Sequence, residues 1–163
     1  MSGSSSSDAP ALLQRKFLVI VDSTPECRVA LRFAARRARH TAGTVSLLYV
    51  IPRGDFQQWA GVERKMREEA GAEADKALQE AARYVESLTG MSPETVVKEG
   101  RAAEEIRALA AADSAIAILV LAAGTQKEGP GPLVSMLAGA GGYPIPVTVV
   151  PGSLSDSEID ALS

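Results

Sequence analysis

The residues best suited to bind a ligand form a glycine-rich stretch, GTQKEGPGPLVSMLAGAGG, which spans residues 124–142. It holds six of the fourteen glycines in the chain and lies between two apolar runs, residues 115–123 and 144–151. Glycine lets a ligand approach the backbone closely, and free backbone N–H groups at the start of a helix bind phosphate. Glycines between two strands can equally serve only to turn the chain, so both interpretations are open.

The spacing inside this stretch predicts a short helix. Pro132 fits its first position, with Gly131 as N-cap and Gly139 as the terminating residue. The N-terminus of such a helix would offer an anion its free N–H groups and the positive end of its dipole. Pro130 and Pro132 remove two donors from that cradle. Lys127 is the only cation in the stretch, and a long side chain on a loop is usually solvated.

A second candidate, Asp22, follows the buried apolar strand predicted over residues 16–22. Its carboxylate can accept hydrogen bonds from a ribose or a base edge. It can also accept them from the backbone N–H groups that begin the next helix, with Thr24 sharing that role. In doubly wound sheets, ligands bind beyond the carboxyl ends of the strands where the winding reverses. Asp22 and the glycine stretch would meet there if the first strand is central and the fourth lies beside it.

Cys27 and His40, the single cysteine and the single histidine, argue against a metal site that needs several such ligands. Cys27 lies in a first helical turn, where the dipole could lower its pKa, but we favour a small, partly buried packing role. His40 fits a surface position that interacts favourably with a helix C-terminus. No P-loop, dinucleotide fingerprint or convincing Ser-His-Asp arrangement is present. We therefore predict no catalytic and no metal-binding residues.

Four arginines form a basic stripe on the first helix: Arg28, Arg32, Arg36 and Arg39. We favour a solvated face that pairs with neighbouring acids over a nucleic-acid surface, because the formal net charge is −3. Phe56 and Trp59 are expected to cap the edge of the core rather than close over a ligand. Glu104 and Glu105 are adjacent on a helix and do not face each other, so they are poor evidence for a carboxylate pair.

Apolar periodicity predicts the elements that position these residues. Strands are expected over residues 16–22, 44–51, 94–100, 114–123 and 147–150. The first helix should begin with Thr24 as N-cap and Pro25 as first residue, and should end by Gly43. Further helices are expected over residues 62–88 and 101–113, and Ser155 with Glu158 forms a capping-box pattern for a short terminal turn.

Alternation of strands and helices, with strands that are apolar on both faces, indicates a parallel sheet covered on both sides. We predict an α/β fold with an open, doubly wound, five-stranded sheet. Prolines at both ends of the last strand favour an edge position for it. The predicted organisation is a disordered tail over residues 1–14, one domain over residues 15–152 and a C-terminal tail over residues 153–163.

Composition sets the class of protein. With 163 residues, 46% of them apolar and 23% charged, the chain is expected to be globular. The charge of −3 gives no global attraction to nucleic acid or to a membrane surface. No apolar stretch approaches the ~20 residues that span a bilayer, and no leader pattern is visible. We expect a soluble, cytoplasmic protein that binds neither nucleic acid nor membrane.

Taken together, the motifs resemble those of the universal stress proteins. VDSTPECRVALRFAARRA resembles the family's opening V-D-G-S-x-x-S-x-x-A-L-x-x-A, with Asp22 at the aspartate and Thr24 and Cys27 at the serine positions. LLYVIP resembles the second strand, and ALAAADSAIAILVLAAGT resembles the family's helix, aspartate and strand leading to glycine. PIPVTVVP is similar to its closing P-V-x-V-V. The resemblance covers about residues 16 to 151.

This resemblance implies an adenine nucleotide alpha hydrolase-like fold with the strand order 3-2-1-4-5. It also implies a homodimer joined through the last strand, residues Val147, Thr148, Val149 and Val150. The family has ATP-binding and non-binding members, and binders carry G-x2-G-x9-G-[ST] after the fourth strand. By this pattern a site for ATP or AMP would comprise Asp22, Val50, Gly124, Gly129, Gly131 and Gly139. Here the nine-residue gap is kept, but four residues separate Gly124 from Gly129, and Ala140 replaces the hydroxyl residue.

We therefore predict a cytoplasmic homodimer that acts in stress response by binding a protein partner, without catalysis. The partner's identity is open. The alternative is an ATP- or AMP-binding sensor that uses the cleft between the first and fourth strands, and weak ATP hydrolysis is left open with it. A stand-alone hydrolase is the least favoured hypothesis, because no base or metal carboxylate cluster is visible.

Overall fold

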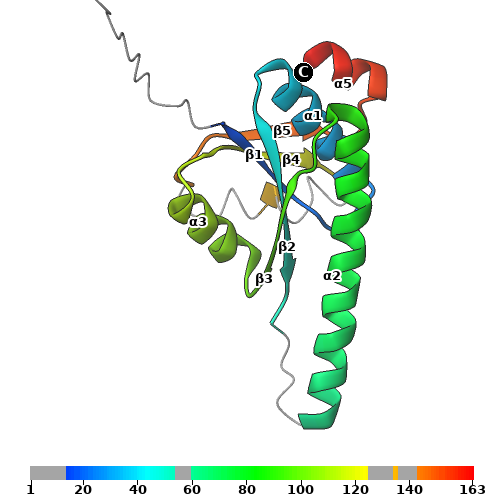
Figure 1. Cartoon of the computed structure of the whole chain (residues 1–163), viewed down its shortest axis with the longest axis vertical. Coiled ribbons are helices and arrows are strands. Elements are labelled where there is room, and N and C mark those ends of the chain that lie inside the picture. The colour runs from blue at the N-terminus through cyan, green and yellow to red at the C-terminus, as the bar shows by residue number, and fades with distance from the viewer. Residues whose placement is uncertain (1–13, 54–59, 125–133, 136–142) are drawn as a thin grey trace, which may run out of the picture.

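The computed structural model of the chain describes residues 14–53, 60–124, 134–135 and 143–163. Five parallel strands form one sheet in the order β3-β2-β1-β4-β5 (Figure 1). Their bounds are β1 Lys16–Ile20, β2 Thr44–Ile51, β3 Glu94–Glu99, β4 Ile116–Ala123 and β5 Val147–Pro151. The predicted fold class, strand order and edge position of the last strand are confirmed.

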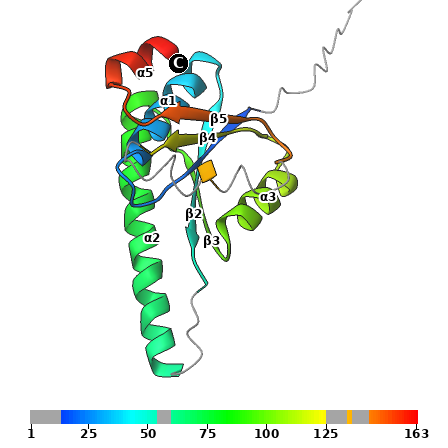
Figure 2. The ribbon, with the colours of Figure 1, turned by 180° about the vertical axis from the view of Figure 1, so that it is seen from behind.

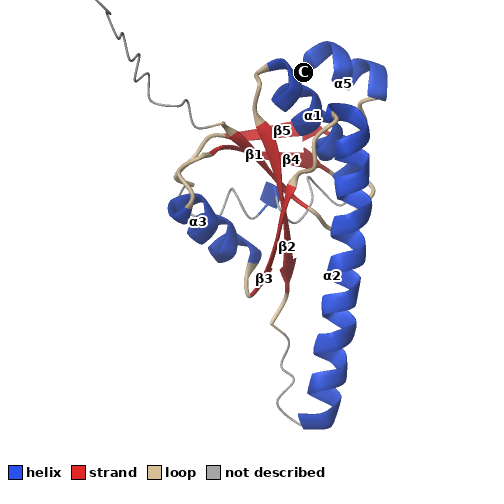
Figure 3. Cartoon of the chain, viewed as in Figure 1, coloured by secondary structure: helices blue, strands red, loops and turns tan. Residues whose placement is uncertain are grey.

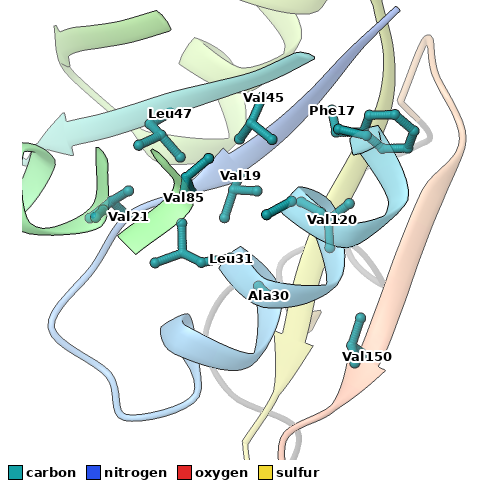
Figure 4. Packing of buried hydrophobic residues seen from close by; sticks show 14 of the residues in the cluster. Phe17, Val19, Val21, Ala30, Leu31, Val45, Leu47, Val85, Val120 and Val150 are labelled. Carbon is teal, nitrogen blue, oxygen red and sulfur yellow. The ribbon is translucent and has the colours of Figure 1, made fainter. Parts of the chain in front are cut away.

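Helices cover both faces of the sheet, as Figures 2 and 3 show. Their bounds are α1 Cys27–His40, α2 Ala60–Thr89, α3 Ala102–Ala112 and α5 Asp156–Leu162. On one face, α1 and α2 pack on a buried cluster that includes Val19, Leu47 and Val120 (Figure 4). On the other face, Ile106 of α3 packs with Leu18, Ile20, Leu48 and others. Successive residues of β1 thus enter opposite cores, which explains its unbroken apolar run.

The predicted start of the first helix is wrong. Thr24 was expected as N-cap and Pro25 as first residue, but α1 begins at Cys27 with Glu26 at the N-cap position. Tight turns precede the helix: the Cys27 N–H donates to the Thr24 carbonyl at 3.2 Å. The Thr24 hydroxyl instead donates to Asp22 Oδ1 at 2.6 Å, so its side chain is engaged with the strand end that precedes it.

The exit from α1 requires glycine. Ala42 has a φ of 57°, and the Gly43 N–H donates to the Ala38 carbonyl at 2.8 Å. A Cβ on Gly43 would lie 2.7 Å from the Arg15 carbonyl oxygen, closer than real Cβ contacts come. The expected termination by Gly43 therefore has a steric cause, namely the close approach of the chain entering β1.

The C-terminal segment forms a packed helix. The predicted capping box is present: the Glu158 N–H donates to Ser155 Oγ at 3.2 Å, and the Ser155 N–H donates to Glu158 Oε2 at 2.7 Å. Ile159 is fully buried, and α5 lies against α1 (Figure 1). The segment predicted as a tail thus contributes to the core.

Several sequence predictions fall outside the described residues. These are the N-terminal tail up to residue 13, Phe56 and Trp59, and the glycine stretch from residue 125 except residues 134–135. Val134 and Ser135 of the predicted short helix are described, and both are helical. Across the described ranges, no helix combines the length and apolarity that crossing a bilayer requires.

Candidate functional site

The predicted site residues Asp22 and Val50 lie at one edge of the sheet. Ile20 of β1 pairs with Leu48 of β2, and Asp22 and Val50 each follow two residues further along the chain. β4 is the other neighbour of β1, and it ends at Ala123, beside Gly124. The expectation that the carboxyl ends of the first and fourth strands lie side by side is therefore correct. Gly129, Gly131 and Gly139 lie outside the described residues.

The Asp22 carboxylate takes part in shaping the turn that follows β1. Its Oδ1 accepts a hydrogen bond from the Thr24 N–H at 2.9 Å and another from the Thr24 hydroxyl at 2.6 Å. This arrangement is a side-chain mimic of a backbone turn, which short acidic residues commonly form. Of the two roles that the sequence left open for Asp22, the described contacts are those of the structural one.

Among the cavities lined by described residues, Asp22 borders one and Val50 borders another. Asp22 borders a depression of about 320 Å³ between α1 and α2. Its lining residues are Val21, Asp22, Cys27, Arg28, Leu31, Ala77, Glu80, Ala81 and Tyr84. Its floor is apolar, and Arg28 lies over the Tyr84 ring at 5.0 Å from the ring centre.

The cavity beside Val50 is larger, about 720 Å³, and it opens at the start of α3. Its lining residues are Val50, Pro52, Arg53, Gly100, Arg101, Ala102, Glu104 and Glu105. Two guanidinium groups and two carboxylates thus surround an apolar contact at Val50. A mixed lining of this kind suits a ligand with donors, acceptors and an apolar face.

Sequence reasoning missed the residues that follow β3. Gly100 has a φ of 150°, and a Cβ there would meet Glu105 Oε1 at 2.7 Å. Arg101 lies 3.8 Å from Glu104 in an exposed ion pair. A usable signal was present, because Gly100 follows a strand and precedes a helix, as Asp22 does. The rule that pointed to the end of β1 does not apply here, because it concerns the point where the winding reverses and β3 is an edge strand.

Cys27 has the properties of a packing residue. Its side chain is partly buried, and Sγ lies 3.7 Å from the Ile20 carbonyl oxygen to which it donates. Burial raises the pKa of the Cys27 thiol to about 11. Desolvation therefore outweighs any effect of the helix dipole, and the favoured interpretation of this residue is the one that the structure supports.

The arginine stripe of α1 pairs with acids, as expected, but it is not a fully solvated face: the acids come from α5, and the Arg32 side chain is only 13% exposed. Arg32 Nη2 lies 2.8 Å and Arg36 Nη2 lies 3.0 Å from Asp160 Oδ2. Hydrogen bonds from Arg32 and then Arg36 lower the pKa of Asp160 to about 2. Arg28 lies 3.3 Å from Asp156 in a more exposed pair. The stripe therefore holds α5 on α1.

Arg39, the last arginine of the stripe, and His40, which follows it, also make contacts. Arg39 donates to the Leu88 carbonyl at 3.4 Å, which joins α1 to the end of α2. His40 is exposed at the last residue of α1, with Nδ1 2.7 Å from the Ser163 carbonyl oxygen. This is the surface position at a helix C-terminus that was expected. Over the described ranges, no cluster of three or more His, Cys, Asp or Glu residues is arranged to hold a metal ion.

Comparison with known families assigns the chain. The model of the universal stress protein family matches residues 14–139. The chain therefore belongs to the universal stress protein family. A search of curated proteins gives no match.

Solved structures share the fold. Universal stress protein UspA from Lactobacillus plantarum is 21% identical, with a TM-score of 0.71 over 83% of this chain and 97% of that one. A universal stress protein from Archaeoglobus fulgidus in complex with dAMP is 18% identical, with a TM-score of 0.64 over 85% and 99%. Another universal stress protein, in complex with cAMP, is 15% identical, with a TM-score of 0.62 over 86% and 98%. At these identities the similarity concerns the fold alone.

Proposed function

We propose that this chain is a homodimer joined at β5 that acts in the cytoplasm, in stress response, by binding a protein partner and without catalysis. The observation that carries the proposal is the edge of the sheet. β5 is the last strand, and its Val149 side chain is 42% exposed. An apolar edge strand with unpaired backbone groups is a template for a second strand.

Symmetry makes a second copy the natural occupant of this edge. Two copies that meet at β5 would pair Val147, Thr148 and Val149 with the same residues across a twofold axis. Such pairing would bury Val149 and satisfy the outward backbone groups of both strands. The apolar, β-branched composition of β5 favours this packing.

The absence of catalysis is proposed because the reactive groups that sequence analysis singled out are engaged in structural contacts. The Asp22 carboxylate holds the Thr24 turn, and the Cys27 thiol is held neutral by burial. Asp160 is paired with two arginines. None of these groups is placed as a nucleophile beside a base, which is the arrangement that nucleophilic catalysis requires.

The proposal is tested by sedimentation velocity at low micromolar concentration and moderate salt. The wild-type chain should sediment as a dimer, and Val149→Asp should sediment as a monomer because a charge would enter the seam. Val97→Asp is the matched control, because Val97 is 41% exposed on β3 at the opposite edge. A monomeric wild-type chain, or equal effects of the two substitutions, would refute dimerisation through β5.

A nucleotide-binding function is the second candidate, favoured by the cavity beside Val50. Its volume of about 720 Å³ and its mixed lining suit an adenosine-sized ligand, and two relatives are described in complex with cAMP and dAMP. In this case AMP would bind, and Val50→Glu would abolish binding because a carboxylate would replace the apolar contact. An unchanged affinity for AMP in that variant would show that AMP does not bind in this cavity.

A further inference from the structure

The helix α2 is much longer than the sheet on which it packs. Its thirty residues span about 45 Å, whereas the eight residues of β2 span about 26 Å. Figures 1 and 2 show the N-terminal half of α2 extending beyond the strands. This half of the helix is therefore a projection from the body of the molecule.

The two halves of α2 differ sharply in burial. Ala74, Leu78, Ala81 and Val85 are buried in the C-terminal half. Between residues 62 and 73, no residue is buried, and Val62 and Met66 are 54% and 43% exposed. A helical segment of about a dozen residues is marginally stable by itself in water. A second surface that covers its apolar residues would stabilise it.

One face of the projection carries a distinctive set of side chains. With 3.6 residues per turn, Val62, Lys65, Met66, Glu69 and Glu73 lie on a common face. We call it the α2 projection face. Lys65, Glu69 and Glu73 take part in no ion pair among the described residues, whereas Glu63 and Arg67 on the adjoining side pair at 2.9 Å.

The charge pattern of this face is complementary to itself in the antiparallel direction. Within residues 62–73, its cation Lys65 lies nearer the N-terminus and its two carboxylates nearer the C-terminus. Lys76 continues the same face beyond this segment. In an antiparallel pair centred near residue 68, Lys65 of one copy lies between the levels of Glu69 and Glu73 of the other. Met66 of each copy then lies level with Ala70 of the other, where a small side chain leaves room. Antiparallel helices also align their dipoles favourably.

We propose that the α2 projection face is a homotypic contact, in which the projecting halves of two copies pack antiparallel. Glu69 and Glu73 also border a cavity of about 370 Å³, whose lining residues are Ile51, Pro52, Met66, Arg67, Glu69, Ala70, Glu73 and Glu99. Its three carboxylates would attract a basic segment, although Arg67 opposes this. Lys65 on the same face would repel such a segment. A second copy instead brings carboxylates to Lys65 and a lysine to Glu69 and Glu73. This contact is separate from the β5 seam and does not depend on it.

The experiment uses the Val149→Asp chain, so that the β5 edge does not contribute. We expect this chain to dimerise reversibly in sedimentation equilibrium at about 100 micromolar and low salt, because screening is weak there. Adding Lys65→Glu should weaken association at least tenfold, because all three charges would then be negative. Adding Glu69→Lys with Glu73→Lys should weaken it similarly, because all three would be positive. An equimolar mixture of the two should form a heterodimer.

Matched controls lie on the opposite side of the same helix. Arg64→Glu, and Glu68→Lys with Asp75→Lys, make the same charge changes at exposed positions away from the face. They should leave association within about twofold of the Val149→Asp chain, and circular dichroism should show equal helix content in all variants. All of the changed positions are exposed, so the fold is expected to persist.

Three results would overturn the proposal. The first is a Val149→Asp chain that stays monomeric throughout this concentration range. The second is an equimolar mixture of the two reversed variants that forms no heterodimer. The third is an equal loss of association in the controls. A monomer that instead binds a helical peptide of leucine and lysine would assign the face to a basic partner, and would also refute the homotypic contact.

Discussion

At the residue scale, Cys27 should be a poor nucleophile. With its pKa raised to about 11 by burial, roughly one thiol in a thousand is ionised at pH 8. Alkylation by iodoacetamide at that pH should therefore be at least about a hundredfold slower than for a free cysteine, and should become fast in denaturant. Mass spectrometry of the quenched reaction measures both rates. Native alkylation at the rate of a free thiol would contradict the packing role.

Asp160 gives a second prediction at this scale. Its pKa in the folded state is lowered to about 2 by Arg32 and Arg36, below its value of ~3.9 in an unfolded chain. The carboxylate therefore stabilises the fold above about pH 4, and this stabilisation is lost as the pH falls through about 2. Asp160→Asn should lower Tm at pH 7, and its difference from wild type should shrink steadily below pH 4.

Thermal scans from pH 7 to pH 2 measure that difference. Asp75→Asn is the control, because Asp75 is exposed on α2 and makes no described ion pair. A difference between Asp160→Asn and wild type that is independent of pH would show that the loss arises from packing rather than from the ion pairs.

At the element scale, α5 should be an integral part of the fold. Its residue Ile159 is fully buried. The capping box stabilises its start, and ion pairs join it to α1. Ile159→Ala should cost about 2–5 kcal/mol of unfolding free energy, as for other buried aliphatic residues. Urea denaturation measures this loss, and Leu162→Ala is the control because Leu162 is 63% exposed. A loss below about 0.5 kcal/mol in Ile159→Ala would mean that α5 is only loosely attached.

The elements themselves were largely predictable from the sequence, for physical reasons. Unbroken apolar runs in β1 and β4 are typical of strands buried on both faces, and they led to the parallel sheet. The start of α1 was not predictable, because Thr24 can either cap a helix or bond to Asp22, and the sequence does not favour one. The projection of α2 beyond the sheet could not be predicted either, because Val62 and Met66 continue the apolar periodicity of its buried half.

The candidate site was predictable only in part. Asp22 and Val50 each lie two residues beyond the paired residues Ile20 and Leu48, and the resemblance to the family is what singled them out. Among the cavities lined by described residues, Asp22 borders the one between α1 and α2, and Val50 borders the one at the start of α3. Arg53 and Arg101 come from connections that carry no motif, so spacing alone did not bring them to Val50.

At the scale of the whole molecule, we propose two contact surfaces for other chains among the described residues. The β5 edge presents Val149, and the α2 projection face presents Val62 and Met66. If both contacts form, each copy has two different twofold interfaces, and the assembly is either a closed tetramer or an open array. This arrangement is consistent with a protein that acts by binding rather than by chemistry.

The central claim is that this member of the universal stress protein family works through protein contacts. Calorimetric titration of the purified chain with ATP and Mg²⁺ tests it most directly, after mass spectrometry has checked for co-purified nucleotide. We predict no binding heat up to about millimolar ATP. Any binding free energy would then be weaker than about −4 kcal/mol. Saturable binding at micromolar affinity would contradict the claim and would identify the protein as a nucleotide sensor.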